Sequence, residues 1–538
     1  MGIALVACGD PATRIAQTDD ADGGAEDGNS THVTGCAPAE VADPALRERI
    51  HAAWDLARPA IAASLDTQAL RQNPYPIYNA QLQTANLLFY ADYHQDAELL
   101  ESLAAVYDLA FDALTTTDVA FYYNAVDGDG VTIPKSVATL PAPTRMWVYP
   151  AETGFPIGRE DVLSSAQFLY AVARVVRIGT EMHEPSPALR AFITRAVPIL
   201  VHDHYLRWLV RAPNLPGAFQ VKGWGCNDGT FDHREHIAHL LARRYGTDYF
   251  ETYQSRSYCN AFTDRDLWII AGIAEVLAAA DLDDSALGLA ENDLGTLREH
   301  VQNGVALTEA RHDVRAVVLR DGTAATVAVF DPGTGDDHVD NQYAGFTGTS
   351  SACTACRSSC TDVCPEFPGW KSATNKTPRI APVPATGLAW DISHARRLVA
   401  VYDSLHRHRD VLGTTFPTRD DIAELAREFG HVVWNGDEDA PYFTNRFNGN
   451  DGWYRVNYSA RPAYGIAPGG FTKDAGRMGF GFWREFDADV GRAMDAMHGI
   501  DLESTDPANE STARSILIAV LPESAPYETR DGPCPWAE

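Results

Sequence analysis

The stretch EDVLSSAQFLYAVARVV, residues 160–176, carries apolar side chains at intervals of 4, 3, 4 and 3 residues. These side chains are Val162, Ala166, Leu169, Ala173 and Val176. Such spacing places them on one stripe of an α-helix, because the helix repeats about every 3.6 residues. Glu160 and Asp161 come first, where the partial positive charge of a helix N-terminus favours acids. The stretch therefore predicts a helix with one buried face.

The same periodicity runs through most of the chain. Two further helices are predicted to begin with capping boxes, at Thr263-x-x-Asp266 and Thr418-x-x-Asp421. Similar stripes occupy residues 42–65, 80–92, 97–115, 188–211, 232–245, 289–310, 393–410 and 485–499. Together they predict roughly a dozen helices.

Only short segments depart from this helical pattern. Residues 313–330 alternate around Asp321-Gly322, which predicts a β-hairpin, and residues 453–458 alternate as a short strand. Residues 331–386 contain clustered cysteines, many Gly, Pro, Ser and Thr residues, and little periodicity. We therefore expect one large helical domain, residues 36–538, with an insertion over residues 312–386.

A run of about twelve helices joined by long loops resembles the α/α toroid, in which antiparallel helical hairpins circle a central axis. We expect a mainly all-α fold, an α/α toroid of about six helical hairpins, with an irregular or solenoid helical arrangement as the alternative. The resemblance implies a carbohydrate-active enzyme: a polysaccharide lyase, a uronate epimerase or an inverting glycoside hydrolase.

The charge balance excludes one class of partner. The chain has 538 residues, 43 of them basic and 73 acidic, for a formal net charge of −30. Nucleic acid is not expected to bind, because its recognition depends on basic side chains that neutralise phosphates. The hydrophobic content of 45% excludes general disorder. No run of 18 apolar residues predicts a transmembrane helix.

The N-terminal segment Leu5-Val6-Ala7-Cys8 resembles the lipobox of bacterial lipoproteins, in which the cysteine is acylated. Too few residues precede Cys8 for a whole signal peptide, so we interpret residues 1–8 as the remnant of a longer one. Residues 9–35 are acidic and nearly free of large apolar side chains, which predicts a disordered tether. The sequence thus predicts an exported lipoprotein of the cell envelope or surface, with membrane contact only through its lipid.

Eight further cysteines predict disulfides, because an exported chain meets an oxidising compartment. Four are clustered with the spacing C-x2-C-x3-C-x3-C, and a bound metal is the alternative there. These four are Cys353, Cys356, Cys360 and Cys364. The other expected pairs are Cys226–Cys259 and Cys36–Cys534, although spacing alone does not determine connectivity.

Five loops combine aromatic, amide, acidic and arginine side chains. They are residues 71–79, 146–160, 222–236, 390–397 and 434–464. Aromatic faces beside hydrogen-bonding groups suit sugar rings, whereas the alternative is that these aromatics only pack the loops onto the helices. The substrate-binding candidates are Trp224, Trp390, Trp434, Trp453, Arg461 and Tyr464.

The catalytic candidates depend on the reaction. A lyase or epimerase needs a base and a group that neutralises the substrate carboxylate, which Tyr454, Arg455, Asn227 and His394 supply by type. An inverting hydrolase needs two carboxyl groups, for which Asp228 and Asp451 are candidates. We favour a lyase or epimerase acting on a polysaccharide or oligosaccharide. The alternative is a non-catalytic lipoprotein that binds glycans or a protein.

No cofactor is expected. The acids of the Gly-rich turn after the hairpin could hold Ca2+, although we favour a solvated turn. These acids are Asp331, Asp336, Asp337 and Asp340. Asp232, His233 and His236 could share a metal, and the alternative is that the histidines are ordinary surface or core residues.

Overall fold

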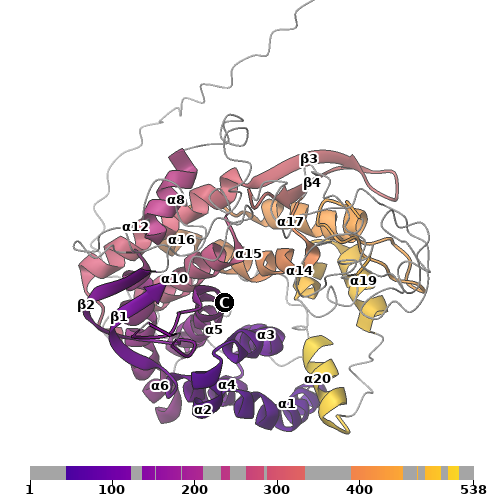
Figure 1. Ribbon diagram of the computed structural model, residues 1–538. Coiled ribbons are helices and arrows are strands. Elements are labelled where there is room, and N and C mark those ends of the chain that lie inside the picture. The colour runs from indigo at the N-terminus through magenta and orange to yellow at the C-terminus, as the bar shows by residue number, and fades with distance from the viewer. Residues whose placement is uncertain are drawn as a thin grey trace, which may run out of the picture. The chain divides into compact units, whose positions relative to one another are not determined.

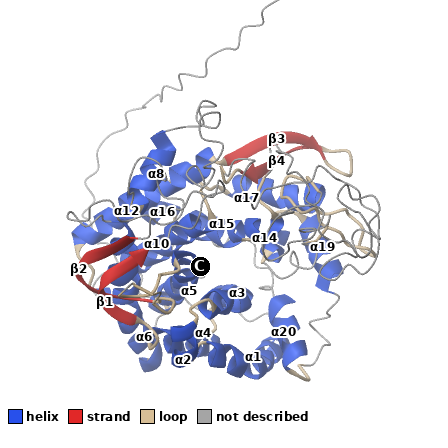
Figure 2. Cartoon of the chain, in the orientation of Figure 1, coloured by secondary structure: helices blue, strands red, loops and turns tan. Residues whose placement is uncertain are grey.

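The computed structural model describes residues 44–122, 136–151, 153–154, 156–182, 184–209, 232–242, 262–283, 287–333, 389–451, 469–470, 479–498 and 507–519. All of them belong to one compact unit, Thr34–Glu538. Its described part is mostly helical, so the prediction of a mainly all-α fold is confirmed. Figure 2 shows this predominance of helices, with strands confined to two hairpins.

Four helices form an inner layer: α3 (Pro76–His94), α5 (Val162–Glu181), α10 (Asp264–Leu282) and α15 (Arg397–Arg407). Helix α5 contacts both α3 and α10, and α10 contacts α15 (Figure 1). The stripe in residues 160–176 becomes the most buried part of this layer, because α5 has neighbours on several sides.

A second layer packs outside these four helices. Helix α4 covers α3 and α5, α6 covers α5, and α12 covers α10. Helix α20 contacts α3 on the side away from α5, and α1 packs on α20. The bounds are α1 (Pro44–Ser64), α4 (Ala97–Phe111), α6 (Pro187–Pro198), α12 (Glu291–Ala310) and α20 (Glu510–Ala519).

Shorter helices complete the described part. They are α2 (Thr67–Gln72), η1 (Ile199–Tyr205), α7 (Leu206–Leu209), α8 (His233–Ala242), α14 (Ile392–Ala395), α16 (Arg409–Leu412), α17 (Arg419–Arg427), η4 (Glu428–Val433), η5 (Phe480–Glu485) and α19 (Ala488–His498). The stretch predicted as one helix over residues 188–211 is α6 and α7 joined by the π-helical η1. None of the helices in these ranges is long and apolar enough to cross a membrane.

Local signals fix several helix starts as predicted. The capping boxes of α10 and α17 both form: Thr263 pairs with Asp266, and Thr418 pairs with Asp421. Asp161 is the N-cap of α5, where its carboxylate accepts from the Ser164 amide. These side chains satisfy backbone N–H groups that would otherwise lack partners in the first helical turn.

The predicted hairpin is present as β3 (His312–Val318) and β4 (Ala324–Phe330), which pair antiparallel around Asp321-Gly322. Gly322 has a φ of +87°, which suits glycine because it has no Cβ. The second hairpin, β1 (Thr115–Tyr122) and β2 (Ser136–Met146), was not predicted. The helix expected over residues 97–115 ends at Phe111, and the β-branched Thr115, Thr116 and Thr117 begin a strand instead.

The four inner helices are joined by buried charges in their C-terminal halves. Asp92 of α3 accepts from Arg174 and Arg177 of α5, at 2.6 and 2.5 Å. Arg177 also reaches Glu275 of α10 at 2.8 Å, and Arg174 reaches Asp403 of α15 at 2.8 Å. Burial alone would raise the pKa of Asp92, but the arginines hold it well below its ordinary value. Since the C-terminal halves meet one another, the four helices run in the same direction.

Candidate active site

The N-terminal ends of the inner helices meet around Tyr78, in the first turn of α3. Arg396 Nη2 and Arg397 Nη2, at the start of α15, donate to the Tyr78 hydroxyl over 3.1 and 2.5 Å. Asp264, the first residue of α10, lies 3.0 Å from Arg397 Nη2. Gln167 in the first turns of α5 donates to the Tyr78 carbonyl at 3.1 Å. One tyrosine therefore links elements that lie far apart in the sequence.

The two arginines are positioned by the short helix α14. Asp391 is its N-cap, and its Oδ1 accepts from the amides of Ser393 and His394. The Ser393 carbonyl then accepts from both Arg396 Nε and Arg397 Nη1. The N-cap Asp391 therefore helps to fix where the two guanidinium groups lie.

A small pocket opens beside these arginines, with a volume of about 30 Å3. Its polar lining comes from Gln81, Asn86, Trp268, Arg396 and Arg397. The Asn86 amide is engaged by the Ile518 carbonyl at 2.6 Å, and the Trp268 indole N–H donates to Gln167 at 3.1 Å. Apolar residues of α3 and α15 form the rest of the lining. The pocket combines an aromatic ring, an amide and two cations.

The two cations differ in their charge partners. Arg397 has Asp264, and its pKa is raised because burial is outweighed by Tyr78 and Asp264. Arg396 is 8% exposed, and burial together with Arg397 lowers its pKa to about 10, so it is still charged at neutral pH. Among the described residues, no carboxylate forms an ion pair with Arg396; its acceptors are the Ser393 carbonyl and the Tyr78 hydroxyl. Asp264 raises the pKa of Arg396 without forming an ion pair with it. A buried cation without a directly paired anion is costly, so this position favours an anionic ligand.

His394 forms a dyad with Asp391 next to the arginines. Its Nδ1 lies 2.6 Å from Asp391 Oδ2, and its ring stacks on Trp390 at 5.9 Å between centroids. The His394 side chain is 25% exposed. If Asp391 accepts the Nδ1 proton, Nε2 carries a lone pair, which is the arrangement of a general base. His394 thus has the polarised imidazole of a general base, and its catalytic role stays a prediction, since His394 and Tyr78 both lie outside the residues that line the pocket.

Parts of three of the five loops predicted from composition come together here. Residues 71–79 supply Tyr78, and residues 390–397 supply its two arginines. From residues 146–160, Tyr149 donates to the N-cap Asp161 at 3.4 Å. Burial and Asp161 raise the pKa of Tyr149 to about 12, and the charge of Asp161 also helps to raise that of Tyr75. A fourth loop reaches the same region, because Arg446 pairs with Asp391 in a β-bridge.

Other predicted residues have structural partners. Asp451 accepts from the amides of Asn445 and Gly469, at 3.2 and 3.1 Å, and from the Tyr442 hydroxyl, so it organises its own loop. Trp434 is 1% exposed, with the Arg320 guanidinium 4.8 Å from its ring centroid. Trp390 is 6% exposed and packs between Phe330 and His394. Burial leaves little of either ring for a sugar, which favours the packing alternative for these two tryptophans.

The metal candidates in the described residues also have local partners. Asp331 accepts from the Gly333 amide at 2.7 Å within its turn. His233 is buried and lies in a chain of contacts, 3.1 Å from Asp266 and 2.9 Å from His300. Asp232 accepts from the Glu235 amide at 2.7 Å at the start of α8. His233 is therefore a core residue, and its neighbour His300 could not be inferred from the local spacing.

The remaining candidates lie outside the described residues. They are Cys8, Trp224, Asn227, Asp228, Asp336, Asp337, Asp340, Trp453, Tyr454, Arg455, Arg461, Tyr464 and all the cysteines of the expected disulfides. Their assignments stay predictions.

Sequence reasoning named the loops of this site but not its central residues. Tyr78, Arg396 and Arg397 were not singled out, because nothing local indicates that residues 318 positions apart form a hydrogen bond. Comparisons with protein-family models, curated proteins and solved structures find no match to the chain.

Proposed function

We propose that this protein is a carbohydrate-active enzyme that acts on acidic polysaccharides at the pocket beside Arg396. The observation that carries the proposal is Arg396 itself: it is buried, charged at neutral pH, and has no carboxylate partner among the described residues while it lines a pocket. A uronate carboxylate supplies the missing anion, and a guanidinium can bind it through two parallel hydrogen bonds. The Gln81 amide in the lining can hydrogen-bond a sugar hydroxyl, whereas Trp268 is 3% exposed and packs against Tyr170.

We also propose that the helices form an α/α toroid. The series α3–α5–α10–α15, with helices of the second layer behind it and α20 against the far side of α3, supports an α/α toroid. Parallel inner helices direct several N-termini to the same end, where their dipoles favour an anion. We assign the substrate site to that end.

The available groups fit β-elimination or epimerisation of a uronate. Arg396 neutralises the carboxylate, which acidifies the neighbouring C5–H bond. His394 Nε2 takes the C5 proton, the C5 electrons form the C4=C5 double bond, and the C4–O bond breaks. The Tyr78 oxygen already accepts two guanidinium N–H groups, so its own O–H is left to protonate the departing oxygen. An epimerase would instead return a proton to the opposite face of C5. Tyr454 and Arg455 stay alternative candidates for the base and the cation.

The test is a screen of acidic and neutral polysaccharides, read by the ultraviolet absorbance of the new double bond, by reducing ends and by NMR for epimerisation. We expect turnover of an acidic polymer. Replacing His394 by Gln should lower it by about 10²–10⁴-fold, the usual loss when a general base is removed. Arg190→Ala, which changes an exposed arginine of α6, is the matched control and should keep full activity.

Three results would count against the proposal. Turnover only of neutral polymers would remove the role of Arg396, and full activity in His394→Gln would move the base elsewhere. Binding of acidic oligosaccharides without turnover would favour a glycan-binding protein over an enzyme.

We also propose that the chain is exported and anchored by a lipid on Cys8. Protein expressed behind a lipoprotein signal peptide should partition into membranes, and Cys8→Ser should release it. Unchanged partitioning in that variant would end the anchor proposal without affecting the enzymatic one.

A further inference from the structure

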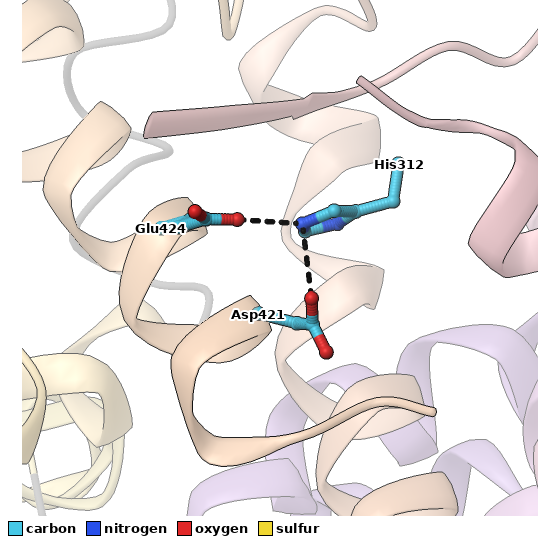
Figure 3. A group of neighbouring side chains, drawn as sticks. All are labelled: His312, Asp421 and Glu424. Carbon is cyan, nitrogen blue, oxygen red and sulfur yellow. Dashed lines mark hydrogen bonds and ion pairs between the residues drawn. The ribbon is translucent and has the colours of Figure 1, made fainter. Parts of the chain in front are cut away.

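A second cluster of reactive side chains lies away from the pocket, where the β3–β4 hairpin meets α17. Figure 3 shows His312, at the start of β3, facing Asp421 and Glu424 on one side of α17. His312 Nε2 lies 3.2 Å from Glu424 Oε2 and 3.8 Å from Asp421 Oδ1. One atom from each residue lies within 4.8 Å of the other two. We propose that these three residues bind a divalent transition-metal ion, with Zn2+ as the best match.

The spacing suits a metal ion better than direct hydrogen bonds alone. Tetrahedral ligands at about 2.1 Å from Zn2+ would lie roughly 3.4 Å from one another. The measured distances of 3.2 and 3.8 Å fall on either side of that value. The longer one exceeds a hydrogen bond, so Asp421 Oδ1 is near the imidazole without being bonded to it. Small side-chain movements would place all three atoms around one ion.

The imidazole is already oriented for metal binding. The His312 side chain is 3% exposed, and its Nδ1 lies 3.1 Å from the Tyr402 hydroxyl. The Tyr402 hydroxyl can either accept from Nδ1 or donate to it. When it accepts, Nε2 presents a lone pair to the carboxylates. Metal-binding histidines usually donate their other ring N–H in this manner.

The carboxylates are also arranged as ligands. The capping box of α17 occupies Asp421 Oδ2, through the amide and hydroxyl of Thr418, which leaves Oδ1 directed at His312. Glu424 follows one turn later on the same helix face. In the described part of the chain, neither acid has an arginine or lysine partner, whereas Asp92, Glu275 and Glu428 each have at least one arginine. Two carboxylates beside one imidazole carry negative charge that a bound cation would balance.

The mixed ligand set selects the kind of ion. Zn2+ accepts one imidazole and two carboxylates, with water in the fourth position. Asp421 is 23% exposed, so solvent can reach the site. Ca2+ prefers six to eight oxygen ligands, which this cluster does not supply. The ion would fasten the hairpin to α17.

A second cluster of similar composition provides the matched control. His431 lies near Asp487 and Asp489, but through different ring nitrogens, Nε2 at 3.0 Å and Nδ1 at 3.3 Å. Arg320 and Arg492 already pair with Asp489. The two nitrogens lie on different edges of the imidazole ring, so a single ion bound to one of them cannot also contact the acid that faces the other. The positive charges of Arg320 and Arg492 would also repel a metal ion. This cluster should bind no metal.

The experiment titrates the purified full-length protein with Co2+ and Zn2+ after its thiols have been alkylated or confirmed as oxidised. We expect one site with a Co2+ spectrum of nitrogen and oxygen ligands, without the charge-transfer band of a thiolate. His312→Gln and Glu424→Gln should each lower the affinity by more than about 100-fold, and Tyr402→Phe by about 10–100-fold. His431→Gln should leave it unchanged.

The proposal is overturned if the protein binds neither ion at micromolar concentration, or if His312→Gln binds as tightly as the wild type. A spectrum with thiolate ligands, or preferential binding of Ca2+, would assign the ion elsewhere. Circular dichroism of each variant verifies that it is folded. Because binding is measured directly, none of these results depends on enzymatic activity.

Discussion

Two buried charges illustrate how a residue's partners separate structure from function. Asp92 is fully buried, but three arginines from two helices surround it, so its charge is balanced within the protein. Arg396 is nearly as buried, yet its described acceptors are one carbonyl and one hydroxyl. Asp92 therefore connects helices, whereas Arg396 lines the pocket to which we assign the substrate.

The Asp92 network leads to a prediction about stability. Asp92→Ala leaves Arg174, Arg177 and Arg407 with fewer negative charges in a site that excludes water, so the free energy of unfolding should fall by about 3–5 kcal/mol. Asp55→Ala, which removes an exposed pair with Arg58, should change it by no more than about 0.5 kcal/mol. Urea denaturation measures both. Similar small changes in the two variants would show that the network is not a major stabilising feature.

Buried histidines predict a dependence of stability on pH. Burial lowers the pKa values of His204, His233 and His300. Below about pH 6.5 the unfolded chain binds protons at these positions while the folded chain does not, so stability falls as the pH drops. Glu428 acts in the opposite direction, because burial raises its pKa to about 7. These three histidines outnumber Glu428, so we expect the net free energy of unfolding to fall as the pH drops.

We therefore expect the free energy of unfolding to fall between pH 6.5 and 5.5 by up to about 1 kcal/mol for each excess histidine. His204→Asn retains a donor for the Ile199 carbonyl and should reduce this slope. Urea titrations at several pH values provide the measurement. Constant or increasing stability over this range would contradict the assignment of neutral, buried imidazoles.

At the scale of secondary-structure elements, helices were predicted where the signal is local. Apolar stripes and capping boxes involve residues within one or two turns, so α5, α10 and α17 could be found from the sequence. The β1–β2 hairpin could not, because its pairing depends on a partner strand across a long connection. The hairpin at Asp321-Gly322 was found because its turn is short and has a characteristic sequence.

Packing between elements gives a prediction with a matched pair of glycines. Gly272 of α10 faces η1, and a Cβ there would lie 2.1 Å from the Tyr205 hydroxyl. Gly295 of α12 has nothing within 4 Å of the same position. Gly272→Ala should destabilise the protein by about 1–3 kcal/mol through overpacking, although alanine favours helices. Gly295→Ala should stabilise it by about 0.5–1 kcal/mol.

Thermal and urea unfolding of the two alanine variants distinguish packing from helix propensity. Equal effects at both positions would show that propensity dominates and that α10 and η1 are not tightly packed. Opposite signs would confirm the contact.

At the scale of the whole protein, the site depends on distances that composition does not encode. The loops at residues 71–79 and 390–397 were recognised from their residue types, but their meeting through Tyr78 is a consequence of α3 and α15 lying in one layer. Conversely, Trp390 and Trp434 have the residue type expected of sugar platforms, yet they are buried. Residue type identified loops that meet in the structure, and three-dimensional packing decided which of their side chains are exposed.

The most direct measurement of the central claim compares kcat/KM for a uronate polymer and for the same polymer with its carboxyl groups reduced to alcohols. The wild-type protein should prefer the acidic polymer by on the order of 100-fold, because a buried guanidinium gains a charge-assisted partner. Arg396→Gln should lose most of that preference, while Arg190→Ala keeps it. Equal rates on the two polymers, or an unchanged preference in Arg396→Gln, would contradict the assignment of Arg396 as the group that recognises the substrate carboxylate.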